Sequence, residues 1–253
     1  MAKYDDLTEF LLRLGDSALI QAQRLCEWTG RAPALEEELG MMNVGLDLVG
    51  QARNWYDYAA ERINDGTDAD ALAFRRDERA FRNLLLVEQP NGDFAVTMTK
   101  QFFYDAWQYH LLTLLKSAND ERIAAIASKS LKEVTYHLRR SSQWVERLGD
   151  GTEESHQRME NAIDTVWRFT FELVEQNDTE WSLSEAGLIP VLSELPELWH
   201  ATVSEVFTNA TLTVPDAAST FYLSARTGMH SEHLGLLLAE MQFLQRAYPD
   251  ASW

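Results

Sequence analysis

Two stretches of predicted helix carry half of a metal-binding pattern. They read Asp47-x-x-Gly50, inside NVGLDLVGQAR, and Glu133-x-x-Tyr136, inside KEVTYHLRR. In helical bundles that bind two iron or manganese ions, two helices each supply Glu-x-x-His and two others supply one carboxylate each. The three-residue step puts both ligands on one helix face. Here Gly50 and Tyr136 stand where imidazoles are required. The pattern therefore indicates a bundle that is related to these metal-binding oxygenases but lacks the histidine ligands of their metal site.

The long predicted helices each offer one carboxylate near the midpoint: Asp16, Asp47, Asp105 and Glu133. Carboxylates in a core without a cation must be paired or protonated, because an isolated buried charge is poorly solvated. We therefore expect side-chain ion pairs in place of a metal. The basic residues available as partners are Arg24, Arg53, Lys129, Lys132 and Arg140.

Two imidazoles leave an oxidase open as an alternative. His110 and His137 follow Asp105 and Glu133 by five and four residues, so either could be a displaced ligand of a di-iron or di-manganese centre. The simpler interpretation of His137 is a contact with Glu133 one helical turn away.

The last predicted helix offers a third interpretation. His230, His233 and Glu240 share one face of it, and such side chains bind zinc, although the spacing is not that of an H-E-x-x-H metalloprotease. We expect these histidines instead to lie near an interface between subunits or to satisfy buried polar groups. A basic cluster that could receive phosphates is interpreted as a salt-bridged surface; its members are Arg75, Arg76 and Arg79.

These side chains must be positioned by a helical fold. Apolar residues at three- and four-residue steps predict long helices over about 7–30, 34–64, 93–117, 120–148 and 152–177. Shorter helices are expected over 74–86, 194–209 and 229–247, and residues 211–214 form the one strand-like run. We expect one domain over 1–253, with a core bundle at about 7–177 and a less regular part at about 178–253. The expected apolar seam of the second helix is Leu35, Leu39, Met42, Leu46, Val49 and Tyr56.

Composition narrows the function classes. The 253 residues are 45% apolar and contain six Pro and twelve Gly, which suits one large helical core. A net charge of −18 argues against nucleic acid and anionic membranes as partners. No apolar run is long enough to span a bilayer, and MAKYDDLTEF lacks the features of a signal peptide, so we expect a cytoplasmic protein. The single cysteine, Cys26, excludes an intrachain disulfide and is expected to be buried.

Several long segments resemble one family. LRLGDSALIQAQRLCEW, NVGLDLVGQARN, RDERAFRNLLLVEQPNGDFA, KEVTYHLRRSSQWVERLGDGT and HSEHLGLLLAEMQ occur in the order seen in the structural subunits of bacterial phenylacetyl-CoA epoxidase. The resemblance covers about residues 11–245 and implies an all-α, ferritin-like antiparallel bundle with additional C-terminal helices. It also implies that this chain holds no catalytic, cofactor-binding or metal-binding residue. The least family-like stretch is 176–200.

The resemblance further implies partners. A homologous catalytic subunit holds the di-iron centre, a second, small subunit joins the pair, and a reductase component supplies electrons from NADPH. The complex converts the coenzyme A thioester of phenylacetate to its ring-1,2-epoxide. The expected function is therefore a non-catalytic scaffold for the catalytic subunit, in a heterodimer or larger assembly with self-association. The alternatives are an active di-iron oxidase with unusual ligands and a mononuclear zinc enzyme at His230 and His233.

Overall fold

The computed structural model describes residues 4–216, 224–249 and 251, and within these ranges the chain is helical without any β-strand. The chain divides into two compact units. Unit 1 comprises the described residues within Met1–Pro90 and Leu223–Trp253, and unit 2 those within Asn91–Tyr222. Across the described residues, no helix is long and apolar enough to cross a membrane. The prediction of one domain over 1–253 stays a prediction.

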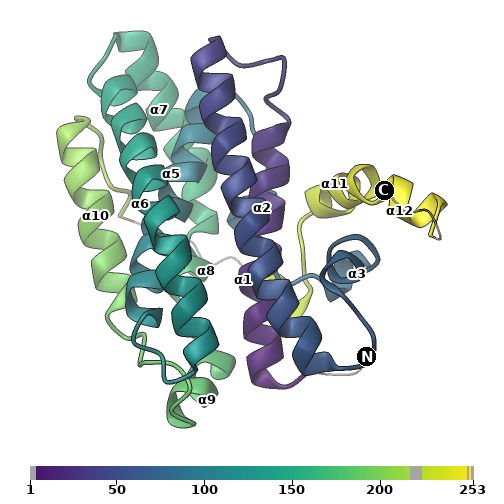
Figure 1. Ribbon diagram of the computed structural model, residues 1–253. Helices are drawn as coiled ribbons and strands as arrows, with labels where there is room; N and C mark the ends of the chain where they lie inside the picture. Colours follow the sequence, from purple (N-terminus) through teal and green to yellow (C-terminus); the bar gives the residue numbers. More distant parts are fainter. Residues whose placement is uncertain (1–3, 217–223, 250, 252–253) are drawn as a thin grey trace. The chain divides into compact units, whose positions relative to one another are not determined.

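Unit 1 is built on two long helices that lie side by side (Figure 1): α1 covers Asp6–Cys26 and α2 covers Leu35–Ile63. The Asp5 side chain caps α1 by accepting a hydrogen bond from the Thr8 amide at 2.8 Å. The helices approach closely at Gly15, where an added Cβ would come within 2.6 Å of the Tyr56 ring. Cys26, the last residue of α1, is exposed, so the prediction that it is buried was wrong.

The predicted seam of α2 was also wrong. Tyr56 is buried as expected, but four other seam members are exposed: Leu35, Leu39, Leu46 and Val49. The residues of α2 that face its own chain are Met41, Val44, Leu48, Ala52, Trp55, Tyr56 and Ala59. The α2 helix therefore carries two apolar stripes. The α1 helix covers the stripe that contains Met41, Val44 and Leu48, and the predicted stripe stays exposed.

The segment after α2 holds short helices in place of the predicted helix over 74–86. These are α3 (Ala69–Phe74), the 3₁₀ turn η1 (Glu78–Ala80) and α4 (Leu85–Glu88). Between η1 and α4 the chain is extended, and its amides bind α1 side chains: Arg82 N donates to Asp16 and Leu84 N donates to the Ser17 hydroxyl. Those buried bonds replace the bonds that a continuous helix would have made.

Unit 2 contains α5 (Phe94–Leu115), α6 (Glu121–Gly149), α7 (Glu153–Val166) and α10 (Leu195–Asn209), as predicted apart from the length of α7. The predicted helix over 152–177 ends at Val166 and continues as η2 (Trp167–Phe169) and α8 (Phe171–Val174). Trp167 lies there against Phe103 and Trp199, and this aromatic packing favours the break. A helix absent from the prediction, α9, covers Asp178–Glu185.

The described C-terminal residues belong to unit 1. They form η3 (Ala225–Thr227), α11 (Glu232–Met241) and α12 (Phe243–Ala247), where one helix over 229–247 was predicted. The break falls at Gln242, whose side-chain amide donates to the carbonyl oxygens of Ala73 and Arg76. The strand-like run 211–214 is not a strand, and Thr211 adopts a left-handed conformation with φ 56° after α10.

Candidate functional site: buried carboxylates held by protein donors

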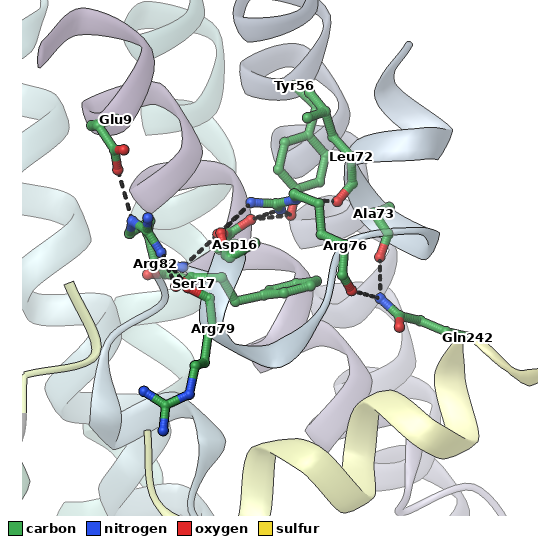
Figure 2. A network of polar contacts seen from close by, with 12 residues as sticks. Glu9, Asp16, Ser17, Tyr56, Leu72, Ala73, Arg76, Arg79, Arg82 and Gln242 are labelled. Atoms are coloured by element: carbon green, nitrogen blue, oxygen red, sulfur yellow. Dashed lines mark hydrogen bonds and ion pairs between the residues drawn. The ribbon is translucent and has the colours of Figure 1, made fainter. Parts of the chain in front are cut away.

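Asp16 is the centre of a buried polar network in unit 1 (Figure 2). Its Oδ1 accepts from the Tyr56 hydroxyl at 2.6 Å and from Nη2 of Arg76. Its Oδ2 accepts from Nη1 of Arg76 at 3.1 Å and from the Arg82 amide at 2.7 Å. An ionised carboxylate offers about four lone-pair positions, so these four donors saturate it.

Arg76 is fixed from several sides. Its Nε donates to the Leu72 carbonyl at 2.5 Å, and its Nη1 donates to the Ala80 carbonyl at 3.0 Å. Its guanidinium lies 4.4 Å from the centroid of the Phe81 ring. Burial disfavours the charged guanidinium, but the Asp16 carboxylate outweighs this effect and raises the pKa of Arg76, so Arg76 stays a cation. This buried position differs from the salt-bridged surface that we predicted for Arg76.

Tyr56 acts in the network as a donor. Burial, followed by the nearby Asp16 charge, raises the pKa of Tyr56 well above its ordinary value of 10.0, which keeps the hydroxyl protonated. Beyond η1, Arg82 places its Nε 2.7 Å from the Glu9 carboxylate. The sequence analysis predicted that Asp16 forms an ion pair, but it did not name Arg76 among the possible partners.

Two of the predicted partners, Arg24 and Arg53, have other roles. Arg24 donates to the Glu88 carbonyl at 2.6 Å and pairs with Glu27, and Arg53 lies 3.9 Å from Asp57 on the surface of α2. Arg140 acts on Asp105 in unit 2 through its charge.

A second buried carboxylate in unit 1 was missed by the sequence analysis. Glu88, at the end of α4, accepts from Asn83 Nδ2 at 2.8 Å and from the Ser231 amide at 2.6 Å. His230 Nδ1 lies 2.8 Å from its Oε2, and both side chains are fully buried. The expectation that His230 satisfies buried polar groups is thereby confirmed. Only the three-dimensional fold brings these partners together, because 142 residues separate Glu88 from His230.

In unit 2, Asp105 on α5 is fully buried. Its Oδ1 accepts from Gln101 Nε2 at 2.5 Å, and its Oδ2 accepts from the Ser141 hydroxyl at 2.8 Å. Burial raises the pKa of Asp105 to about 8, although the bonds from Ser141 and Gln101 act in the opposite direction. Asp105 is therefore largely protonated at neutral pH. Of the four carboxylates singled out in the sequence, the two that are buried thus show both predicted outcomes, since Asp16 is paired and Asp105 is protonated.

The two tetrapeptides of the metal-binding pattern, 47–50 and 133–136, do not place their first and last residues in the interior. Gly50 and Tyr136 are exposed, and Asp47 and Glu133 are half-buried. The buried stripe of α6 passes instead through Ser130, Val134, His137 and Ser141. His137 is therefore a core residue, and its contact with Glu133 one helical turn away stays a prediction. Gly50 and Tyr136 therefore do not occupy inward-facing positions of the kind that a metal-binding imidazole would need, which corrects the premise taken from the sequence.

The remaining histidines are placed separately. The half-buried His110 has its Nε2 2.8 Å from the Thr202 hydroxyl, and burial lowers the pKa of His110. The His233 side chain is about 32% exposed, with Glu232 at 4.0 Å, while His230 faces Glu88. Within the part of the chain that the structure describes, no three His, Cys, Asp or Glu side chains are grouped to hold a metal ion.

Comparison with known proteins agrees with the resemblance seen in the sequence. The family model described as "Phenylacetic acid catabolic protein" matches residues 1–253. The chain is 50% identical, over 249 residues, to the C subunit of 1,2-phenylacetyl-CoA epoxidase of Escherichia coli (strain K12). That alignment covers 98% of this chain and 100% of the relative. The predicted all-α, ferritin-like fold class is confirmed. The chain belongs to the phenylacetic acid catabolic protein family.

Proposed function

We propose that this protein is a non-catalytic, structural subunit of a cytoplasmic phenylacetyl-CoA epoxidase. In this proposal a homologous catalytic subunit holds the di-iron centre, and an NADPH-dependent reductase and a small subunit complete the complex. No catalytic, cofactor-binding or metal-binding residue is assigned to this chain. The relative is one subunit of an epoxidase, which supports a role within an assembly. The observation that carries the proposal is the saturation of Asp16.

A carboxylate that ligates a metal must offer a free lone pair. Asp16 has two donors on each oxygen, and two of these four come from the Arg76 guanidinium, which is itself fixed by two carbonyls. A metal ion at Asp16 would have to displace Arg76, leaving a second buried cation without a partner. Asp105 presents a related obstacle, because its proton would have to leave and both oxygens already accept hydrogen bonds. We therefore interpret Asp16 and Asp105 as structural residues of the interior.

The exposed stripe of α2 supports a docking role. We define this stripe as Leu35, Leu39, Met42, Leu46 and Val49, at alternating steps of four and three residues. Four of these side chains are 44–67% exposed, and Met42 is half-buried. Apolar residues at this spacing form the seam of packed helix pairs. We assign the stripe to a helix of the catalytic subunit.

Charge favours such a partner over a second copy of this chain. The start of α2 is acidic, with Glu36, Glu37 and Glu38 in its first turn. The whole chain carries a net charge of −18, so two copies repel each other. A partner helix with apolar residues flanked by Lys and Arg complements this surface. Self-association of the assembly would then use other surfaces.

Metal analysis tests the absence of a redox centre. The purified chain is first assayed for bound zinc; it is then incubated with ferrous iron under argon, desalted, and assayed for iron and, after admission of air, for oxygen consumption. We expect well under one iron per chain. Two irons per chain with oxygen consumption would support the oxidase with His110 or His137, and one zinc per chain would support the zinc enzyme at His230.

Complex formation tests the scaffold role. The chain is produced together with the catalytic subunit of the same complex and analysed by size exclusion. Leu46→Asp is expected to weaken co-elution at least tenfold, because it puts a charge in the centre of the stripe. Gln157→Asp, which adds the same charge at an exposed position of α7, serves as the control and should co-elute like the wild type. Unchanged co-elution of Leu46→Asp would assign the partner to another surface.

A further inference from the structure

The C-terminal residues of unit 1 hold the segment that carries Arg76. We call residues 224–248 the C-terminal strap. Gln242 donates from Nε2 to the carbonyls of Ala73 and Arg76, both at 3.1 Å, and Arg246 donates to the Arg76 carbonyl at 2.8 Å. Figure 2 shows Gln242 reaching these carbonyls beside Asp16. The strap thereby satisfies carbonyl groups that the end of α3 leaves without helical partners.

Near its N-terminal end, the strap is held by hydrogen bonds of His230, one of which depends on a single buried proton. His230 Nε2 lies 3.1 Å from the Phe81 carbonyl, which can only accept, so this nitrogen carries a hydrogen. His230 Nδ1 lies 2.8 Å from Glu88 Oε2, and a second hydrogen must lie between these two atoms. Whether that proton rests on the imidazole or the carboxyl, its loss leaves two acceptors facing each other in a dry site.

We propose that the C-terminal strap is a pH-sensitive clamp, closed by the proton shared between His230 and Glu88 and opened when that proton leaves. The Glu88 carboxylate is the main anchor at this end, because the Ser231 amide and the His230 ring both bind it, and a longer bond of 3.3 Å joins Gln89 Nε2 to the Ser231 hydroxyl. Opening would free the 73–84 segment from Gln242 and Arg246. The ion pair of Arg76 with Asp16 would then lose its outer support.

The charges around His230 set the direction of the effect. Burial acts to lower the pKa of His230, but the bond and charge of Glu88, the Phe81 carbonyl and the more distant Asp16 outweigh it, so the pKa lies above 6.5. The other charged groups of the packed segments include Arg24 on α1, Arg76, Glu78, Arg79 and Arg82 before α4, and Arg226 and Glu232 on the strap itself. Because the folded pKa is raised, the clamp is fully formed below pH 6.5 and is lost as pH rises through the folded value.

Hydrogen exchange of the full chain tests the clamp. Exchange of peptides from the strap and from α1 is followed by mass spectrometry from pH 6 to 10, after correction for intrinsic rates. Above the folded pKa, strap protection should fall roughly tenfold per pH unit, as loss of one proton requires, while α1 keeps its protection. His230→Gln should show low strap protection that does not change with pH. His233→Gln, which alters a partly exposed neighbour, should behave like the wild type.

Two results would overturn the clamp. One is wild-type strap protection that stays constant across the pH range or falls together with that of α1. The other is loss of the pH dependence in His233→Gln. The wild-type profile decides the matter even where His230→Gln does not fold, and neither result bears on the metal and co-elution tests above.

Discussion

Removing Arg76 should destabilise this protein far more than removing its neighbour. Arg76→Met keeps most of the apolar stem but deletes the guanidinium that pairs with Asp16. The Asp16 side chain is fully buried and that of Arg76 is 9% exposed, so little water reaches either one. After the change, Asp16 keeps its bonds from Tyr56 and the Arg82 amide but has no countercharge.

The expected loss follows from this burial. Breaking a buried ion pair by removing one partner costs about 3–5 kcal/mol, because the remaining charge stays buried and uncompensated. For a chain of this size, each kcal/mol lowers the melting temperature by about 2–4 °C, so the expected shift is roughly 6–20 °C. Arg75→Met alters an exposed arginine with one hydrogen bond, to the Pro249 carbonyl, and should stay within about 0.5 kcal/mol of the wild type.

Urea unfolding at pH 7, followed by circular dichroism, measures these differences. Adding Asp16→Asn to Arg76→Met removes the stranded charge and should recover at least about 1 kcal/mol, although Asp16→Asn alone is destabilising. The buried ion pair is refuted if Arg76→Met loses less than about 1 kcal/mol, or if Asp16→Asn makes that variant still less stable. Either result would mean that Asp16 reaches solvent or another cation.

Three other variants test unit 2 and the surface of α2. Because burial raises the pKa of Asp105 to about 8, above the unfolded value of about 3.9, the folded state holds a proton that the unfolded state releases. As pH rises between these two values, the free energy of unfolding of the wild type should therefore fall by up to about 1.4 kcal/mol per pH unit. In Asp105→Asn the urea concentration at the midpoint should change much less between pH 5 and 8. A wild-type midpoint that is already flat would contradict the buried proton. Gly149→Ala would place a Cβ 2.5 Å from the Ala210 carbonyl oxygen and should cost about 1–3 kcal/mol, whereas Gly50→Ala meets nothing within 4 Å and should stabilise the chain by about 0.5–1 kcal/mol. Equal melting temperatures for these two glycine variants would show that at least one of the two local environments is not as described.

Helical periodicity predicted where the long helices lie, but it did not show which face each one buries. On α2, Leu39 and Leu46 repeat at helical spacing as well as Val44 and Leu48 do, and hydrophobicity alone favours the leucine pair. The structure buries the other pair because α1 lies there. Whether a stripe meets its own chain or a partner is a property of the assembly, which periodicity does not record.

The buried network could be predicted only in part. Core carboxylates must be paired or protonated wherever they are buried, and this expectation held for Asp16 and Asp105. The identity of the partner did not follow, because Arg76 lies 60 residues from Asp16 on a segment whose sequence reads as a helix. Similarly, Tyr136 and His137 are adjacent, and a register shift of one residue decides which faces the interior. Only the packing of α6 against α5 settles that choice.

The discontinuity of unit 1 has a consequence for synthesis on the ribosome. Glu88 leaves the exit tunnel 142 residues before His230, which at about 5–20 residues per second is a delay of roughly 7–28 seconds. During that interval every residue of unit 2 up to Tyr222 is produced, while the Glu88 carboxylate must remain hydrated. The first unit to begin emerging is thus the last to be finished, and a nascent chain that stalls before residue 230 exposes a polar interior to the chaperones around it.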